Sequence, residues 1–61
     1  MFKSLLEKAE AGREVYSQAF SAGYVAIWYE DDDGTQYQVQ YDDGIAESVQ
    51  IVGEMKVYFP D

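Results

Sequence analysis

Carboxylates are the only side chains numerous enough to support chemistry in this 61-residue chain, which has twelve Asp and Glu residues but no Cys and no His. The missing residue types exclude Cys-based metal sites and remove the commonest general base and the commonest metal ligand. Paired carboxylates can perform acid–base catalysis, but they need a cleft that so short a chain rarely forms. We therefore expect a protein that is not an enzyme and has no metal site and no cofactor.

The densest group of carboxylates is the run Glu30-Asp31-Asp32-Asp33, which Gly34 follows. Asp-Gly is a strong hairpin signal because Gly readily adopts positive φ, and such a turn needs only one Asp. An EF-hand calcium loop with Gly34 at its sixth position would place Tyr29 first and Gln40 twelfth, and neither supplies the carboxylate required there. The run is therefore either a solvated turn or an acidic surface that binds a partner.

The distribution of charge separates the chain into two parts. Residues 1–23 carry three acids and three bases, whereas residues 24–61 carry nine acids and only Lys56, so the second part holds the whole net charge of −8. Nucleic acid and anionic membranes would repel this field, and a basic, nucleic-acid-binding protein would be attracted by it. The predicted partner-binding carboxylates are Glu30, Asp31, Asp32, Asp33, Asp42, Asp43, Glu47 and Glu54.

Aromatic side chains are the second group with a functional interpretation, since Tyr and Trp are enriched among the residues that dominate binding energy at interfaces. The chain has six Tyr and one Trp. Packing in the core or on the sheet explains most of them. The candidates for aromatic anchors at an interface are Trp28, Tyr29, Tyr37 and Tyr41.

The elements that must position these residues follow from the periodicity of the apolar side chains. Ser4 and Glu7 have capping-box spacing, and apolar residues at helical spacing predict a helix over about 4–21, with two shorter helices divided at Gly12 as the alternative. From Tyr24 onward the period is two, which predicts strands over about 24–30, 35–41, 45–52 and 55–59. We therefore expect one domain over 1–61 with an α+β fold, in which an N-terminal α-helix packs on a three- or four-stranded antiparallel β-meander.

The side of the sheet that faces the helix follows from the same alternation. The apolar strand residues predicted to face it are Val25, Ile27, Val39, Val49, Ile51, Val57 and Phe59, although Tyr24, Ala26 and Trp28 compete for the inward positions of the first strand. Gln36, Gln38 and Gln40 are expected on the solvent face. With no signal peptide and no apolar run of membrane-spanning length, we expect a cytoplasmic protein of a bacterial host cell, either a monomer or a homodimer.

In size, charge and layout the chain resembles the short acidic anti-CRISPR proteins of phages, especially those that act on type I systems. That resemblance implies a DNA mimic that blocks target-DNA binding by the CRISPR surveillance complex. It implies that the eight carboxylates above face the Lys and Arg residues that normally hold DNA. No sequence motif of that class is matched.

Two further resemblances are local. Residues 31–37, DDDGTQY, look like the acidic hairpin turn of one family of uracil-DNA glycosylase inhibitors, although the leading helix departs from that pattern. Residues 37–49, YQVQYDDGIAESV, look like a strand pair of Tudor or SH3-like barrels, which would imply a peptide-binding module with an aromatic cage for methylated side chains. The chain has few strands for a closed barrel.

Overall fold

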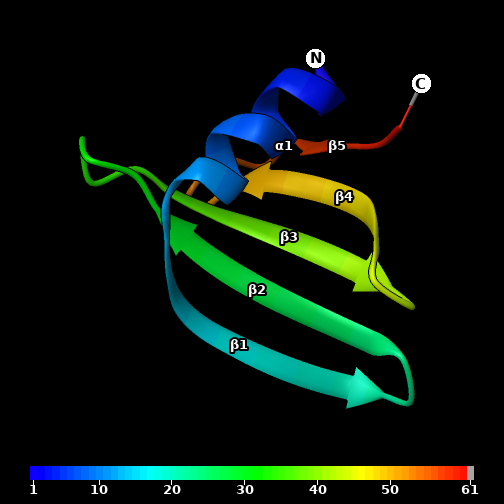
Figure 1. Ribbon diagram of the computed structural model, residues 1–61. Coiled ribbons are helices and arrows are strands. Elements are labelled where there is room, and N and C mark those ends of the chain that lie inside the picture. The colour runs from blue at the N-terminus through cyan, green and yellow to red at the C-terminus, as the bar shows by residue number, and fades with distance from the viewer. Residues whose placement is uncertain (61) are drawn as a thin grey trace.

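One helix packs on one face of a five-stranded antiparallel sheet (Figure 1). The computed structural model describes residues 1–60. The helix α1 spans Phe2–Ala11, and the strands are β1 (Arg13–Ser21), β2 (Tyr24–Glu30), β3 (Gln36–Asp42), β4 (Ile45–Ile51) and β5 (Val57–Tyr58). The strands pair in chain order, so the sheet is an open meander with β1 and β5 at its edges. The predicted α+β class is confirmed, with one strand more than expected.

The predicted helix over 4–21 is wrong beyond Ala11. Gly12 has extended backbone (φ −82°, ψ −173°), and Arg13–Ser21 forms strand β1. Val15, Tyr16, Ala19 and Phe20 satisfy helical spacing, yet the segment is rich enough in β-branched and aromatic residues to form a strand. Antiparallel pairing with β2, from Arg13 opposite Glu30 to Ser21 opposite Tyr24, decides between the two structures.

The start of α1 also differs from the prediction. The helix begins at Phe2, and its N-cap residue, Met1, makes no side-chain capping bond. Instead of accepting an amide proton, the Ser4 hydroxyl donates to the Met1 carbonyl at 3.1 Å. A ten-residue helix is only marginally stable alone in water, so α1 depends on packing against the sheet.

The core lies between α1 and strands β3 and β4. Val39 and Val49 are fully buried and face each other across these strands, and Ala9 of α1 is fully buried against them. Because Ile27 pairs with Val39 and Tyr29 pairs with Tyr37, the helix side of β2 carries Ile27 and Tyr29. Of the two alternating sets of β2 side chains, the one with Ile27 and Tyr29 therefore faces the helix. Val57 and Phe59, predicted to face inward, are 39% and 64% exposed.

The opposite face of the sheet is partly covered by its own side chains. Gln36 is exposed, as predicted, whereas Gln38 and Gln40 are half-buried. Ala26 and Ser48 are buried there, and the Tyr16 and Trp28 rings meet at a centroid distance of 5.2 Å. This face of the sheet is therefore less exposed to solvent than the alternating Gln residues of β3 indicate.

The helix leaves one side of the sheet uncovered. An α-helix is about 10 Å wide and strands lie about 4.8 Å apart, so one helix covers two or three strands. Here α1 contacts β2, β3 and β4, and every residue of β1 is exposed. Figure 1 shows β1 as a bare edge at the side of the sheet away from α1.

Candidate acidic binding surfaces

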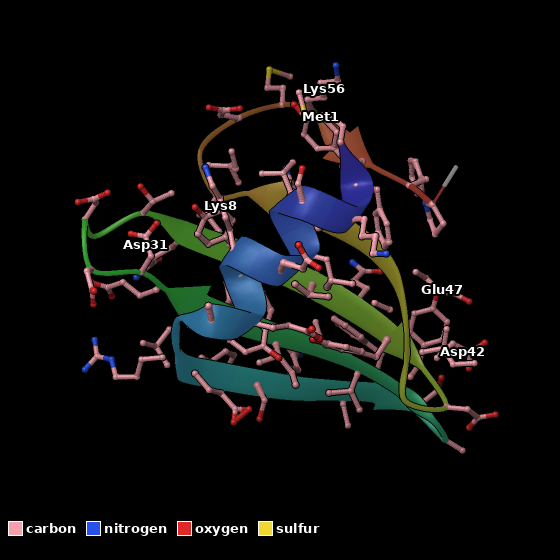
Figure 2. All side chains as sticks on the ribbon, turned by 45° about the horizontal axis from the view of Figure 1, so that its top comes forward. Met1, Lys8, Asp31, Asp42, Glu47 and Lys56 are labelled. Carbon is pink, nitrogen blue, oxygen red and sulfur yellow. The ribbon has the colours of Figure 1, made fainter. Side chains whose placement is uncertain are left out.

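The carboxylates gather at the two ends of the sheet, because successive turns of a meander lie at opposite ends. The β2–β3 end carries Glu30, Asp31, Asp32 and Asp33, and the β3–β4 end carries Asp42, Asp43 and Glu47. Strand β3 runs between them, and six steps of about 3.4 Å give a separation of roughly 20 Å. Figure 2 shows Asp31 on one side of the molecule and Asp42 with Glu47 on the other.

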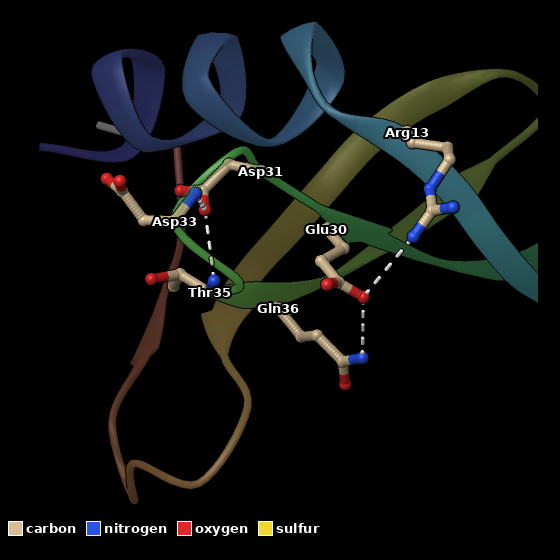
Figure 3. A network of polar contacts seen from close by, with 6 residues as sticks. All are labelled: Arg13, Glu30, Asp31, Asp33, Thr35 and Gln36. Atoms are coloured by element: carbon tan, nitrogen blue, oxygen red, sulfur yellow. Dashed lines mark hydrogen bonds and ion pairs between the residues drawn. The ribbon is translucent and has the colours of Figure 1, made fainter.

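At the β2–β3 end, Asp31 holds the turn together (Figure 3). Its Oδ1 accepts hydrogen bonds from the amide groups of Asp33 and Thr35, both at 2.9 Å, and its Oδ2 accepts one from the Tyr37 hydroxyl at 2.9 Å. Desolvation raises the pKa of Asp31, but these hydrogen bonds and the nearby charge of Lys8 outweigh it and lower the pKa on balance. The Asp31 carboxylate therefore serves the fold of its own hairpin.

Glu30 is also engaged within the chain. Its Oε1 lies 3.6 Å from Arg13 Nη2 and accepts a hydrogen bond from Gln36 Nε2 at 3.3 Å (Figure 3). Asp32 and Asp33 are exposed, and no hydrogen bond or ion pair engages their carboxylates. Two of the four acids in this run are therefore presented to solvent without an internal partner.

Glu54 lies at the same end of the sheet as the β2–β3 turn. It lines an open hollow of about 680 Å³ together with Gly34 and Thr35 of the β2–β3 turn. The Glu54 carbonyl accepts a hydrogen bond from Gln50 Nε2 at 2.9 Å, which ties the loop after β4 to that strand. The loop therefore adds a carboxylate at the same end of the sheet as Asp32 and Asp33.

At the β3–β4 end, the carboxylates of Asp42 and Glu47 lie near Tyr24, and Asp43 follows in the adjoining turn. The Tyr24 hydroxyl donates to Glu47 Oε2 at 2.7 Å, and Tyr24 pairs with Asp42 across β2 and β3. A bulge in β4 makes this possible, because the register shifts so that Gln40 faces Ser48 while Tyr41 faces Ala46, leaving Glu47 as the extra residue. The Asp43 amide donates to the Gly23 carbonyl at 2.8 Å and joins the two turns at this end.

The electrostatics of the β3–β4 end are those of an uncompensated negative site. Desolvation, followed by the charges of Glu47 and Asp43, raises the pKa of the Asp42 carboxyl above its ordinary value of 3.8. The hydrogen bond to Glu47, desolvation and the negative charges of Glu47 and Asp42 raise the pKa of Tyr24. Across residues 1–60 the one ion pair joins Arg13 to Glu30, at the opposite end of the sheet.

The predicted aromatic anchors have mostly structural positions. Tyr37 is only 4% exposed, and Tyr29 and Tyr41 pack against the core beneath α1. The Tyr41 hydroxyl donates to Glu10 Oε2 at 2.7 Å, so its oxygen accepts from Tyr29 at 2.8 Å. Burial, with these hydrogen bonds, raises the pKa of Tyr41 strongly. Trp28 alone of the four lies on the opposite face, where it contacts Tyr16.

The sequence analysis did not identify Tyr24 as a member of the acidic site, because only the β4 bulge brings Glu47 to it and no feature of the sequence marks that bulge.

Within 1–60 no three acids are arranged to hold a metal ion, and no helix there is long and apolar enough to cross a bilayer. The sheet ends at β1 and β5 without closing, unlike a Tudor or SH3-like barrel. Comparisons with known families, curated proteins and solved structures found no match.

Proposed function

We propose that this protein is an inhibitor that occupies the DNA-binding surface of a basic protein, presenting its carboxylates in place of DNA phosphates. The first candidate for the target is a type I CRISPR surveillance complex, which would make the chain an anti-CRISPR protein. The eight predicted carboxylates contribute unequally to this proposal. Glu30 and Asp31 serve the chain's own structure, and the remaining six are the candidates for contact with Lys and Arg of the target.

The observation that carries the proposal is the state of the β3–β4 end. Asp42, Asp43 and Glu47 are held together although desolvation and then their mutual repulsion raise the pKa of Asp42, and no base of the described chain pairs with them. Such an arrangement costs folding free energy unless a partner supplies positive charge. Lys and Arg residues of a DNA-binding groove would supply it through charge-assisted hydrogen bonds.

The spacing of the two acidic ends fits the same target. About 20 Å corresponds to six base pairs of a duplex, which rises about 3.4 Å per pair. A groove that holds DNA backbone over such a length presents basic side chains at both positions. The long-range attraction would accelerate association and weaken as salt is added.

The experiment compares two double variants that change the net charge equally. Asp42→Asn with Asp43→Asn changes the base-free end, and Glu7→Gln with Glu14→Gln changes exposed acids of α1 and β1, so each variant carries −6 instead of −8. Asn is suitable at Asp43 because it tolerates the positive φ of 52° found there. Target-DNA binding by purified, guide-loaded type I surveillance complexes is measured by fluorescence anisotropy as each protein is added.

We expect the unmodified chain to displace DNA, less effectively as salt rises. The Asp42/Asp43 variant should bind about tenfold more weakly, equivalent to about 1.4 kcal/mol, and the Glu7/Glu14 variant should match the unmodified chain. Equal weakening in both variants would show that only net charge matters and would refute the assigned surface. Absence of DNA displacement would reject the CRISPR target, and inhibition of uracil excision in a parallel glycosylase assay would redirect the proposal to a repair enzyme.

A further inference from the structure

Strand β1 is a long edge of the sheet, and its register against β2 shifts at Val15 and at Phe20. All nine residues of β1 are exposed, and the strand pairs only with β2, so the main-chain groups along its other side have no strand partner. Edge strands of soluble proteins are normally protected by charges, Pro or short length, because an open edge is a template for pairing. From Val15 to Ser21 this edge has no charge and no Pro.

The surface around this edge is uncharged in a strongly charged protein. Residues 15–29, which form most of β1 and β2, contain no Asp, Glu, Lys or Arg, although the chain carries −8 overall. A basic partner gains no Coulomb attraction from such a surface. For a second copy of the same acidic chain, however, this is the region where approach meets the least repulsion.

We propose that the chain forms a symmetric dimer by antiparallel pairing of β1 with β1 of a second copy. The register centred on Ser17 pairs the regular segment Tyr16–Ala19, which lies between the two register shifts of β1, and it places Tyr16 opposite Gln18. Tyr16 is 57% exposed and already contacts Trp28, so a neighbouring Gln18 would cover its free side. The product is a continuous ten-stranded sheet.

This arrangement keeps the repulsion between the two acidic chains small. From β3 of one copy to β3 of the other there are five strand spacings, or about 24 Å, against a Debye length of about 8 Å at physiological salt. Arg13, whose side chain is 74% exposed, would lie opposite Ser21 of the second copy, on the side where that copy's Gly23 bonds to Asp43. The one basic residue of β1 is thereby brought toward the base-free acidic end of the other copy.

The test places charges at the two-fold axis. In this register Ser17 faces Ser17 of the second copy, so Ser17→Lys or Ser17→Asp alone sets two like charges against each other. The unmodified chain is expected to sediment at twice its 7.0 kDa mass, and each variant alone is expected to dimerise on the order of tenfold more weakly. An equimolar mixture of the Lys and Asp variants should recover the dimer, which a folding defect could not do.

Gln36→Lys, an exposed position on β3, is the matched charge control and should dimerise like the unmodified chain. Added salt should strengthen the dimer by screening repulsion between two acidic chains, whereas it weakens binding to a basic target, so this inference can fail independently of the proposed function. An unmodified chain that stays at 7.0 kDa overturns the proposal and leaves the edge for a strand of another protein. Dimerisation unaffected by Ser17→Lys overturns it as well, because the interface then lies elsewhere.

Discussion

Replacing Gly12 by Ala tests the junction where the helix gives way to a strand. A Cβ atom at Gly12 would lie 2.7 Å from the Glu30 carbonyl oxygen and 3.0 Å from its carbonyl carbon. Both are backbone atoms of the residue that pairs with Arg13, so they cannot rotate away, and the first pair of the β1–β2 ladder must shift. The backbone angles of Gly12 are accessible to Ala, so the cost is steric.

The magnitude follows from two opposing effects. Overpacking of this kind costs about 1–3 kcal/mol, and the reduced entropy of the unfolded chain returns about 0.4–1 kcal/mol. We expect Gly12→Ala to lower the free energy of unfolding by about 1–2 kcal/mol. At about 0.05–0.15 kcal/mol per residue, a chain of 61 residues has only about 3–9 kcal/mol in total, so the loss is a substantial share.

Urea denaturation followed by Trp28 fluorescence and far-ultraviolet circular dichroism measures this change. Gly44 provides the contrast, because a Cβ there meets nothing within 4 Å but φ is +82°. Gly44→Asn should therefore restore most of the stability lost in Gly44→Ala, since Asn tolerates positive φ. Gly12→Asn should remain as unstable as Gly12→Ala. A Gly12→Ala variant that is more stable and more helical than the unmodified chain would refute the reasoning, because it would favour one continuous helix.

Three further predictions concern the tyrosine and carboxylate networks. Asp31→Asn should lower the free energy of unfolding at pH 7 because folding lowers the pKa of Asp31; this contribution is present above the ordinary value of 3.8 and is lost as pH falls through the folded-state pKa. Asp42→Asn should raise the free energy of unfolding at pH 7, since the raised pKa makes the ionised form costly, and the gain should vanish as pH falls through that pKa and below 3.8. These changes are measured by urea titrations between pH 3 and 7, and a shift of stability in the same direction for both variants at pH 7 would contradict one of the two statements. Tyr41→Phe should cost about 1 kcal/mol, because it removes the hydroxyl that joins Glu10 of α1 to Tyr29 of β2. Tyr16→Phe is the control, because this ring is exposed and its hydroxyl makes no hydrogen bond within residues 1–60. An equal loss of stability in both variants would show that the hydrogen bonds of Tyr41 do not stabilise the fold.

The sequence predicted the fold class and most of the sheet, because strict alternation and Asp-Gly turns are local signals. Strands 24–30, 35–41 and 45–52 were placed within a residue of β2, β3 and β4. It failed over 13–21, where the spacing of apolar residues fits both periods and only pairing with β2 makes the strand. The inward set of the first predicted strand likewise depended on pairing with Val39 and Tyr37.

The candidate site was predictable in position but not in the state of its side chains. The run Glu30–Asp33 reads as four equivalent acids, yet Asp31 is engaged by two amides and the Tyr37 hydroxyl while Asp32 and Asp33 are free. Asp42 and Glu47 are five positions apart in the sequence and belong to different strands, and a β-bulge in β4 brings them together. Such differences depend on three-dimensional register, which residue types alone do not encode.

The narrowness of α1 gives the molecule a thick half and a thin half. Where the helix lies over β3 and β4, opening any strand exposes core side chains such as Val39 and Val49 to water. The side chains of β1 are already exposed to solvent, so detaching this strand exposes little additional apolar surface. Strand β1 can therefore separate while the helix-covered unit of β2, β3 and β4 stays folded. Amide protons of β1 should therefore exchange with solvent through local fluctuations, whereas those of β3 must wait for the whole domain to unfold. The surface most open to association is thus also the part of the fold that opens at the lowest free energy.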